Sequence, residues 1–275
     1  MNAGKPTEKV EILSAGASLA HFVSIRLSFL FVVLALAFAI VLPAQAGAPP
    51  VRISIIPGGS SGIEQEACDR IAHALESSSD IVFSTVNPDW FVVCTITDKN
   101  DQASGQIRYN GTVVVKTNDG QVVDTFSVQK YSQDFSFQPG TPLNKRLVDQ
   151  AARDVIQAMS DRAVNPIQKA VAIEMETRER IIRAETLAQD DKYEEAMAIL
   201  REVGPDSPRF RSVRDLMDEY ALEIQAIQLV DRAKQRARQG NFASAVQILK
   251  QVSKKSKRYK LAQHLMAKYT AGRGA

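Results

Sequence analysis

The sequence has few of the residues that catalytic and metal sites need. It contains three His and two Cys in 275 residues, and only His73 and His264 follow residue 46. The signatures H-E-x-x-H, paired C-x-x-C and G-x-S-x-G do not occur. These absences disfavour metalloenzymes, thiol redox enzymes and triad hydrolases. We therefore expect a protein that is not an enzyme, with no catalytic residue, no metal site and no cofactor.

One glycine-rich turn, "PGGSSG" at 57–62, lies between a predicted strand and a predicted helix. Such a turn can hold phosphate on the first N–H groups of the helix. This one lacks the Lys of a P-loop and does not fit G-x-G-x-x-G. We expect a tight turn in which Ser60 or Ser61 caps the helix. An enzyme with a site in this domain is the alternative.

Long apolar runs are absent after residue 42. The run "LSFLFVVLALAFAIVL" (27–42) follows a polar start and precedes "PAQA", which has small residues at Ala44 and Ala46. This layout predicts a signal peptide over 1–46, cleaved before Gly47. The run is shorter than the roughly 20 residues of a spanning helix. We expect a periplasmic protein, and the alternative is an uncleaved inner-membrane anchor that faces the periplasm.

Cys68 and Cys94 both follow the predicted cleavage point. An oxidising compartment and their places in a helix and a strand favour a disulfide between them. The alternative is two small buried apolar residues. Neither Cys belongs to a C-x-x-C motif.

The predicted fold class is α+β. Residues 50–163 read as β-α-β-β-β-β-α, with a hairpin turn at Asn118-Asp119-Gly120 and an amphipathic closing helix. This order predicts an α/β sandwich of one sheet and two helices. After Asn165-Pro166 the strand patterns stop, and residues 166–270 predict helices only. The expected helices are 166–189, 192–203, 207–239, 242–253 and 256–270, with a break near Ala221 as an option.

The helical half contains a repeat. Adding 49 to a residue number relates two stretches without a gap, and small residues recur where helices approach closely, while large ones recur where a gap must be filled. One register this long predicts the duplication of a structural unit. The structural pairs are Ala184 and Ala233, Tyr193 and Phe242, Ala196 and Ala245, and Leu200 and Leu249.

These residues resemble tetratricopeptide repeats. The family's small residue falls on Ala184 and Ala233, its aromatic and Ala on the next two pairs, and its closing Pro on Pro208. The second copy has Lys257 in place of that Pro, and the 49-residue spacing exceeds the family's 34 by about one helix. The resemblance implies stacked helical hairpins with a surface that binds protein. An ordinary five-helix bundle with an internal duplication is the alternative.

The first domain resembles the small periplasmic α/β domains of envelope assembly proteins. Among these are the amino-terminal domain of the Tol-Pal propeller protein and the periplasmic domain of the curli secretion channel. The phrase "DWFVVCTITD", followed by a hairpin near "NDGQVVD", carries this similarity. It implies a fold only.

Charge divides the helical half. Residues 164–220 hold 9 Lys and Arg against 13 Asp and Glu, whereas residues 221–275 hold 12 against 2. The basic block "KKSKRYK" predicts binding to an acidic protein surface, an anionic lipid surface or a polyanion. Nucleic acid is not expected for an exported protein, and a solvated face is the alternative. The candidate binding residues are Lys254, Lys255, Lys257, Arg258 and Lys260.

Together these patterns predict an exported protein-binding scaffold or adaptor of a cell-envelope complex that uses a helical-repeat surface. A module that docks on anionic lipid or a polyanion through the basic repeat is the alternative.

Overall fold

The computed structural model describes residues 47–272. The described residues from Ala48 onward form one compact unit. The predicted signal segment, 1–46, lies outside the described residues. None of the helices within 47–272 has the length and apolar character needed to cross a membrane.

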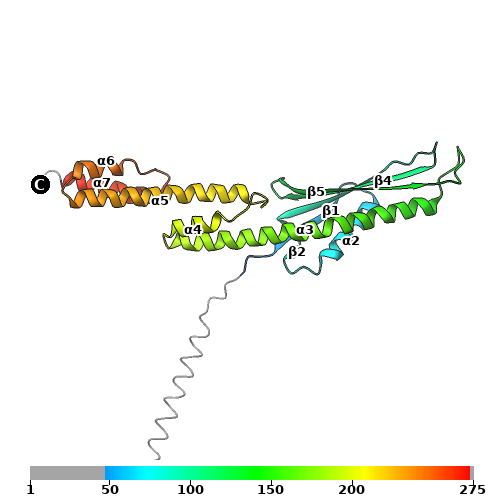
Figure 1. Ribbon diagram of the computed structural model, residues 1–275, viewed down its shortest axis with the longest axis horizontal. Helices are drawn as coiled ribbons and strands as arrows, with labels where there is room; N and C mark the ends of the chain where they lie inside the picture. Colours follow the sequence, from blue (N-terminus) through cyan, green and yellow to red (C-terminus); the bar gives the residue numbers. More distant parts are fainter. Residues whose placement is uncertain (1–46, 273–275) are drawn as a thin grey trace, which may run out of the picture. The chain divides into compact units, whose positions relative to one another are not determined.

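A five-stranded sheet forms the amino-terminal half of this unit (Figure 1). Its strands are β1 (Val51–Pro57), β2 (Ile81–Phe83), β3 (Trp90–Asp98), β4 (Gln106–Thr117) and β5 (Val122–Gln133). The spatial order is β2-β1-β3-β4-β5, in which β1 is parallel to β2 and β3, and β3, β4 and β5 are antiparallel. The predicted element order and the hairpin between β4 and β5 are confirmed.

Two helices pack against this sheet, α2 (Gly62–Leu75) and the first part of α3 (Lys145–Gln189). Their apolar sides join the strands in one core that includes Ile71, Trp90, Val155 and Met159. Ser61 caps α2, because its Oγ accepts the backbone N–H of Glu64 at 3.3 Å. The capping interpretation of the glycine-rich turn is therefore confirmed.

The predicted helix boundary at Asn165-Pro166 is wrong. Helix α3 continues through Pro166 for 45 residues. Proline removes one backbone hydrogen bond and normally kinks or ends a helix. Here Ala163, Ile167 and Val171 are all buried in the sheet domain's core, on both sides of the proline. Packing of this continuous apolar stripe holds the helix together across the missing hydrogen bond.

The remaining helices are α4 (Tyr193–Leu200), α5 (Phe210–Arg238), α6 (Phe242–Leu249) and α7 (Tyr259–Ala271). The optional break near Ala221 does not occur, since α5 is continuous. The short helices α4 and α6 each pack between two longer segments. The α+β class is confirmed: a sheet with two helices, followed by helices only.

The duplication appears as two separate apolar clusters. We name residues 174–220 copy 1 and residues 223–269 copy 2. Six of the eight buried members of the copy 1 cluster have buried counterparts 49 residues later, and the other two correspond to the partly buried Ala237 and Phe242. Each copy therefore has its own apolar cluster, Ile224 and Ile227 of copy 2 also pack against the cluster of copy 1, and α5 belongs to both copies. The recurring pairs include Ala184 and Ala233, Ala196 and Ala245, Leu200 and Leu249, and Tyr220 and Tyr269.

Aromatic contacts repeat as well. Tyr193 packs edge-on against Tyr220 with ring centroids 5.5 Å apart, and Phe242 packs against Tyr269 at 6.1 Å. Each copy consists of three helical segments. In copy 1 the third segment is the first part of α5, which continues into copy 2. This third segment accounts for the spacing of 49 residues.

Candidate functional site

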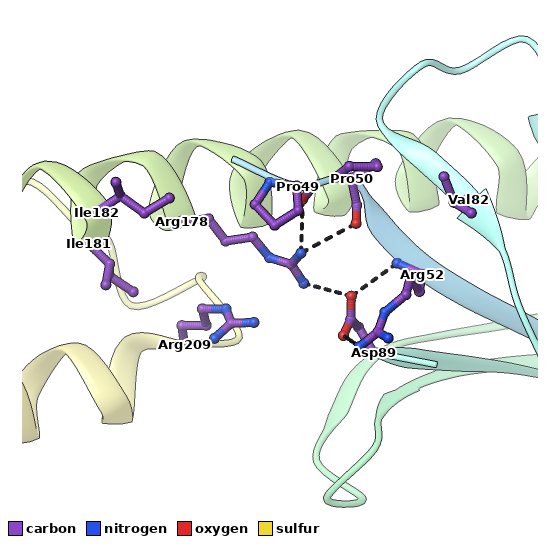
Figure 2. A pocket seen from close by; sticks show the side chains of 9 residues that line it. All are labelled: Pro49, Pro50, Arg52, Val82, Asp89, Arg178, Ile181, Ile182 and Arg209. Atoms are coloured by element: carbon purple, nitrogen blue, oxygen red, sulfur yellow. Dashed lines mark hydrogen bonds and ion pairs between the residues drawn. The ribbon is translucent and has the colours of Figure 1, made fainter. Parts of the chain in front are cut away.

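A groove lies where the sheet domain meets copy 1 (Figure 2). Its volume is about 590 Å³. Its walls are apolar, and three arginines and one carboxylate supply its polar groups. The lining residues are Pro49, Pro50, Arg52, Val82, Asp89, Arg178, Ile181, Ile182 and Arg209.

Arg178 fixes the floor of this groove. Its Nε donates to Glu174 Oε1 at 2.8 Å, its Nη1 to the carbonyl of Pro49 at 3.0 Å, and its Nη2 to Asp89 Oδ2 at 3.0 Å. These bonds join α3 to the chain before β1 and to the turn before β3. The side chain is only 10% exposed, and all three nitrogens are used. Arg178 therefore holds the joint together and has little capacity left for a ligand.

Asp89 is the only carboxylate in the lining. Arg52 donates to it through both its backbone N–H and its Nη2, each at 3.0 Å, and Arg178 donates as well. Burial raises the pKa of Asp89, but these hydrogen bonds outweigh burial and bring the pKa below its ordinary value. A carboxylate with a lowered pKa and two guanidinium partners is a poor general base. Asp89 therefore organises the two arginines.

Glu174 lies beneath the groove and is 1% exposed. Its Oε1 accepts from the Nε of both Arg178 and Arg209. Its Oε2 has no hydrogen-bond partner among the described residues. Removal of this buried carboxylate from between two guanidinium groups would leave two positive charges without their shared partner.

Arg209 differs from the other two arginines. Its side chain is 40% exposed, and its only ion pair among residues 47–272 is the one from Nε to Glu174. Its guanidinium group points toward the open groove in Figure 2. The terminal nitrogens of Arg209 are therefore the cationic donors in this groove that can take an anionic ligand.

The 49-residue register identifies the counterpart of Arg209 in copy 2. Glu174, Ser207 and Arg209 recur in copy 2 as Glu223, Ser256 and Arg258. Arg258 Nη2 pairs with Asp191 Oδ1 of copy 1 at 2.7 Å. Arg258 thus pairs with a carboxylate of the other copy, whereas Arg209 pairs, among the described residues, only with Glu174 of its own copy.

The buried glutamates differ in their partners. Glu223 accepts from Ser256 Oγ at 2.9 Å and from the backbone N–H of Lys257 at 2.7 Å. In copy 1 the equivalent hydroxyl of Ser207 contacts Thr177 Oγ1 at 3.0 Å. Glu174, Ser207 and Arg209 were not among the predicted site residues, although the 49-residue register pairs them with residues of the same type in copy 2.

The predicted basic residues differ in the partners they have within the chain. Lys254, Lys255 and Lys260 are exposed. Arg258 is taken up by Asp191, and Lys257 Nζ lies 3.8 Å from Glu219 Oε1 and 5.9 Å from the centre of the Tyr193 ring. Two of the five candidates therefore join copy 2 to copy 1.

The two cysteines are brought together. Cys68 on α2 and Cys94 on β3 are both buried free thiols. The neighbouring Cys68 thiol and burial raise the pKa of the Cys94 thiol. The spatial proximity agrees with the predicted bridge, which stays a prediction. No cluster of potential metal ligands occurs among residues 47–272.

Comparisons with known proteins add little. No protein-family model matches the chain. The curated proteins contain no match either. Among solved structures, the chain is similar to a PelC dodecamer from Paraburkholderia phytofirmans, with 11% identity over 42% of this chain and 91% of that chain and a TM-score of 0.26. A score this low supports no argument about function.

Proposed function

We propose that this chain is an exported, non-enzymatic scaffold of the cell envelope that binds an acidic polypeptide segment in the groove between the sheet domain and copy 1. Export is inferred from the apolar segment 27–42 and the small residues after it. The helical copies, which resemble tetratricopeptide repeats, supply the rest of the binding surface.

One observation carries this proposal. Arg258 binds a carboxylate of the preceding copy, whereas its counterpart Arg209 faces an open groove with two terminal nitrogens available. A carboxylate from a partner would occupy the place that Asp191 occupies beside Arg258. Charge-assisted pairs between arginine and carboxylate are strong and directional.

The apolar walls favour a polypeptide ligand. Ile182 is 42% exposed and Val82 is 44% exposed, on opposite sides of the groove. Val82 lies on β2, an edge strand of the sheet. An extended segment could place apolar side chains against both residues and one acidic side chain against Arg209.

Photo-crosslinking in intact cells tests this function. A benzophenone side chain in place of Ile182 should capture a polypeptide partner, and the same side chain in place of Leu261 on α7 should not capture that partner. Arg209→Gln should abolish the capture, whereas the matched control Arg214→Gln, an exposed arginine on the same helix, should leave it intact. Equal capture by the Arg209→Gln and Arg214→Gln variants would exclude this groove.

A second candidate function rests on the exposed Lys254, Lys255 and Lys260. These residues could dock the chain on an anionic lipid surface, since each basic residue near such a surface contributes about 1 kcal/mol. Binding to vesicles that contain phosphatidylglycerol should then weaken with salt and with Lys→Gln changes at these three positions. Vesicle binding that is unaffected by those changes would rule this function out.

A further inference from the structure

Copy 1 has a receiving face, which is the surface that contacts copy 2. Copy 2 has an equivalent face, made by the residues 49 positions later. In copy 1 this receiving face consists of Asp191, which pairs with Arg258, and of Tyr193 and Glu219, which contact Lys257. The fold therefore already uses this face to bind a basic polypeptide loop. One aromatic ring and two carboxylates make the contacts.

The same positions in copy 2 have lost their acidic residues. Asp191 corresponds to Gly240, and Glu219 corresponds to Lys268. The neighbouring Glu194 and Glu195, which start α4, correspond to Ala243 and Ser244 at the start of α6. Without these acidic residues the face is not suited to another basic loop, because Lys268 and the basic residues of that loop would repel each other.

The aromatic residue is retained, and it is less covered. Tyr193 is 3% exposed beneath its partners in copy 1. Phe242 at the equivalent position is only half-buried, and Lys268 beside it on α7 is exposed. Gly240 has a positive φ of 77° and Asp191 one of 62°, so this position has the same left-handed backbone conformation in both copies. The face thus keeps this turn and its aromatic residue, loses its carboxylates and gains one lysine.

We propose that this end face of copy 2, formed by Gly240, Phe242 and Lys268, binds an acidic polypeptide segment. A polypeptide is favoured as the ligand because the equivalent face in copy 1 binds polypeptide through single charge pairs and one aromatic ring. This arrangement differs from a broad basic surface. This inference rests on the proposed scaffold function but uses a different site. The partner presents carboxylates where copy 2 presents Lys257 and Arg258 to copy 1.

Two labelled peptides test the proposal. The first has the sequence of residues 252–261, VSKKSKRYKL. The second has Glu at every Lys and Arg position of the first. All proteins carry Arg209→Gln, so that the groove does not contribute. We expect the protein that keeps Gly240 and Lys268 to bind the acidic peptide at least about tenfold more tightly than the basic peptide at low salt. This preference should shrink as salt is added.

The variant Gly240→Asp with Lys268→Glu recreates the acidic residues of copy 1 and should reverse the preference. An added Cβ at Gly240 meets no atom within 4 Å, and the φ of 77° strains a side chain there, although Asp191 adopts the same region in copy 1. Lys268→Glu alone leaves the glycine in place and should remove the preference even if the double variant folds poorly. The control Lys254→Gln, Lys255→Gln, Lys260→Gln changes the net charge by the same amount at exposed positions and should keep the preference.

Three results would overturn the proposal: equal binding of both peptides, a control that loses the preference as fully as the double variant, or a preference that survives Lys268→Glu. A failure of crosslinking through Ile182 would disprove the groove function and would leave these peptide results unchanged. The two proposals can therefore fail separately.

Discussion

The two helical copies share one framework and differ in what their arginines meet. In copy 2, Arg258 and Lys257 find acidic and aromatic partners in copy 1. In copy 1, Arg209 meets the sheet domain, where Asp89 is already paired with Arg52 and Arg178. Duplication has therefore reproduced the core and the arginines, but Arg258 pairs with Asp191 of the other copy, whereas Arg209 pairs with Glu174 of its own copy. We propose that a partner binds at the joint of Arg209.

Replacement of the two buried glutamates should reveal the largest energetic difference between the two copies. Glu174→Gln leaves Arg178 and Arg209 without their shared carboxylate and should lower the free energy of unfolding by about 3–5 kcal/mol. Glu223→Gln loses acceptor strength toward one hydroxyl and one N–H and should cost about 1–3 kcal/mol. Urea denaturation measures both losses. Equal losses would show that the two joints are equivalent in energy.

A bridge between Cys68 and Cys94 would stabilise the sheet domain alone. By restricting the unfolded chain, the closed loop should contribute about 3 kcal/mol. Non-reducing peptide mapping of protein from the periplasm should find the bridged peptide pair. Two free thiols in that material would contradict the prediction.

Overpacking of the shared cores should affect both copies alike. Ala196 and Ala245 have no exposed surface. Leu at either position should lower the free energy of unfolding by about 1–3 kcal/mol. The matched control Ala198→Leu, an exposed position on α4, should have little effect. Wild-type stability in either buried variant would refute the equivalence of the cores.

The smallest expected effect is a pH dependence at the joint with the sheet domain. Because the pKa of Asp89 is lowered in the folded state, the stability it adds is fully present above its unfolded pKa, near 4, and is lost as pH falls through the lower folded value. Asp89→Asn should therefore flatten the acid limb of the stability profile. The exposed control Asp124→Asn should leave that limb unchanged.

Much of this architecture follows from local sequence patterns. Alternating strands, the Asn118-Asp119-Gly120 turn and the recurring Ala and Leu positions predicted the sheet, the hairpin and the duplicated cores. Pro166 misled the prediction of a helix boundary, because the buried residues around it hold the helix through tertiary packing that no local pattern reveals. The 49-residue register relates the glutamates and arginines of the two copies. The hydrogen-bond and ion-pair partners of these residues could not be inferred from it.

The groove could not be predicted for a similar reason. Its lining comes from the chain before β1, the β2 strand, the turn before β3, helix α3 and the start of α5, which only the fold brings together. The basic block was visible as a run of charge, but the sequence could not separate Arg258, which is paired within the chain, from the exposed Lys254. Charge counts give the sign of a surface and leave its internal pairs hidden.

The central claim is that Arg209 binds a partner's carboxylate as Arg258 binds Asp191, and a reciprocal charge exchange tests it most directly. Once the partner captured through Ile182 is identified, Arg209→Glu should abolish crosslinking in intact cells. An Arg in place of the partner's contacting acidic residue should restore crosslinking to the Arg209→Glu protein and should abolish it with wild-type protein. Capture that is unchanged by Arg209→Glu, or that no acid-to-Arg change in the partner restores, would contradict the claim.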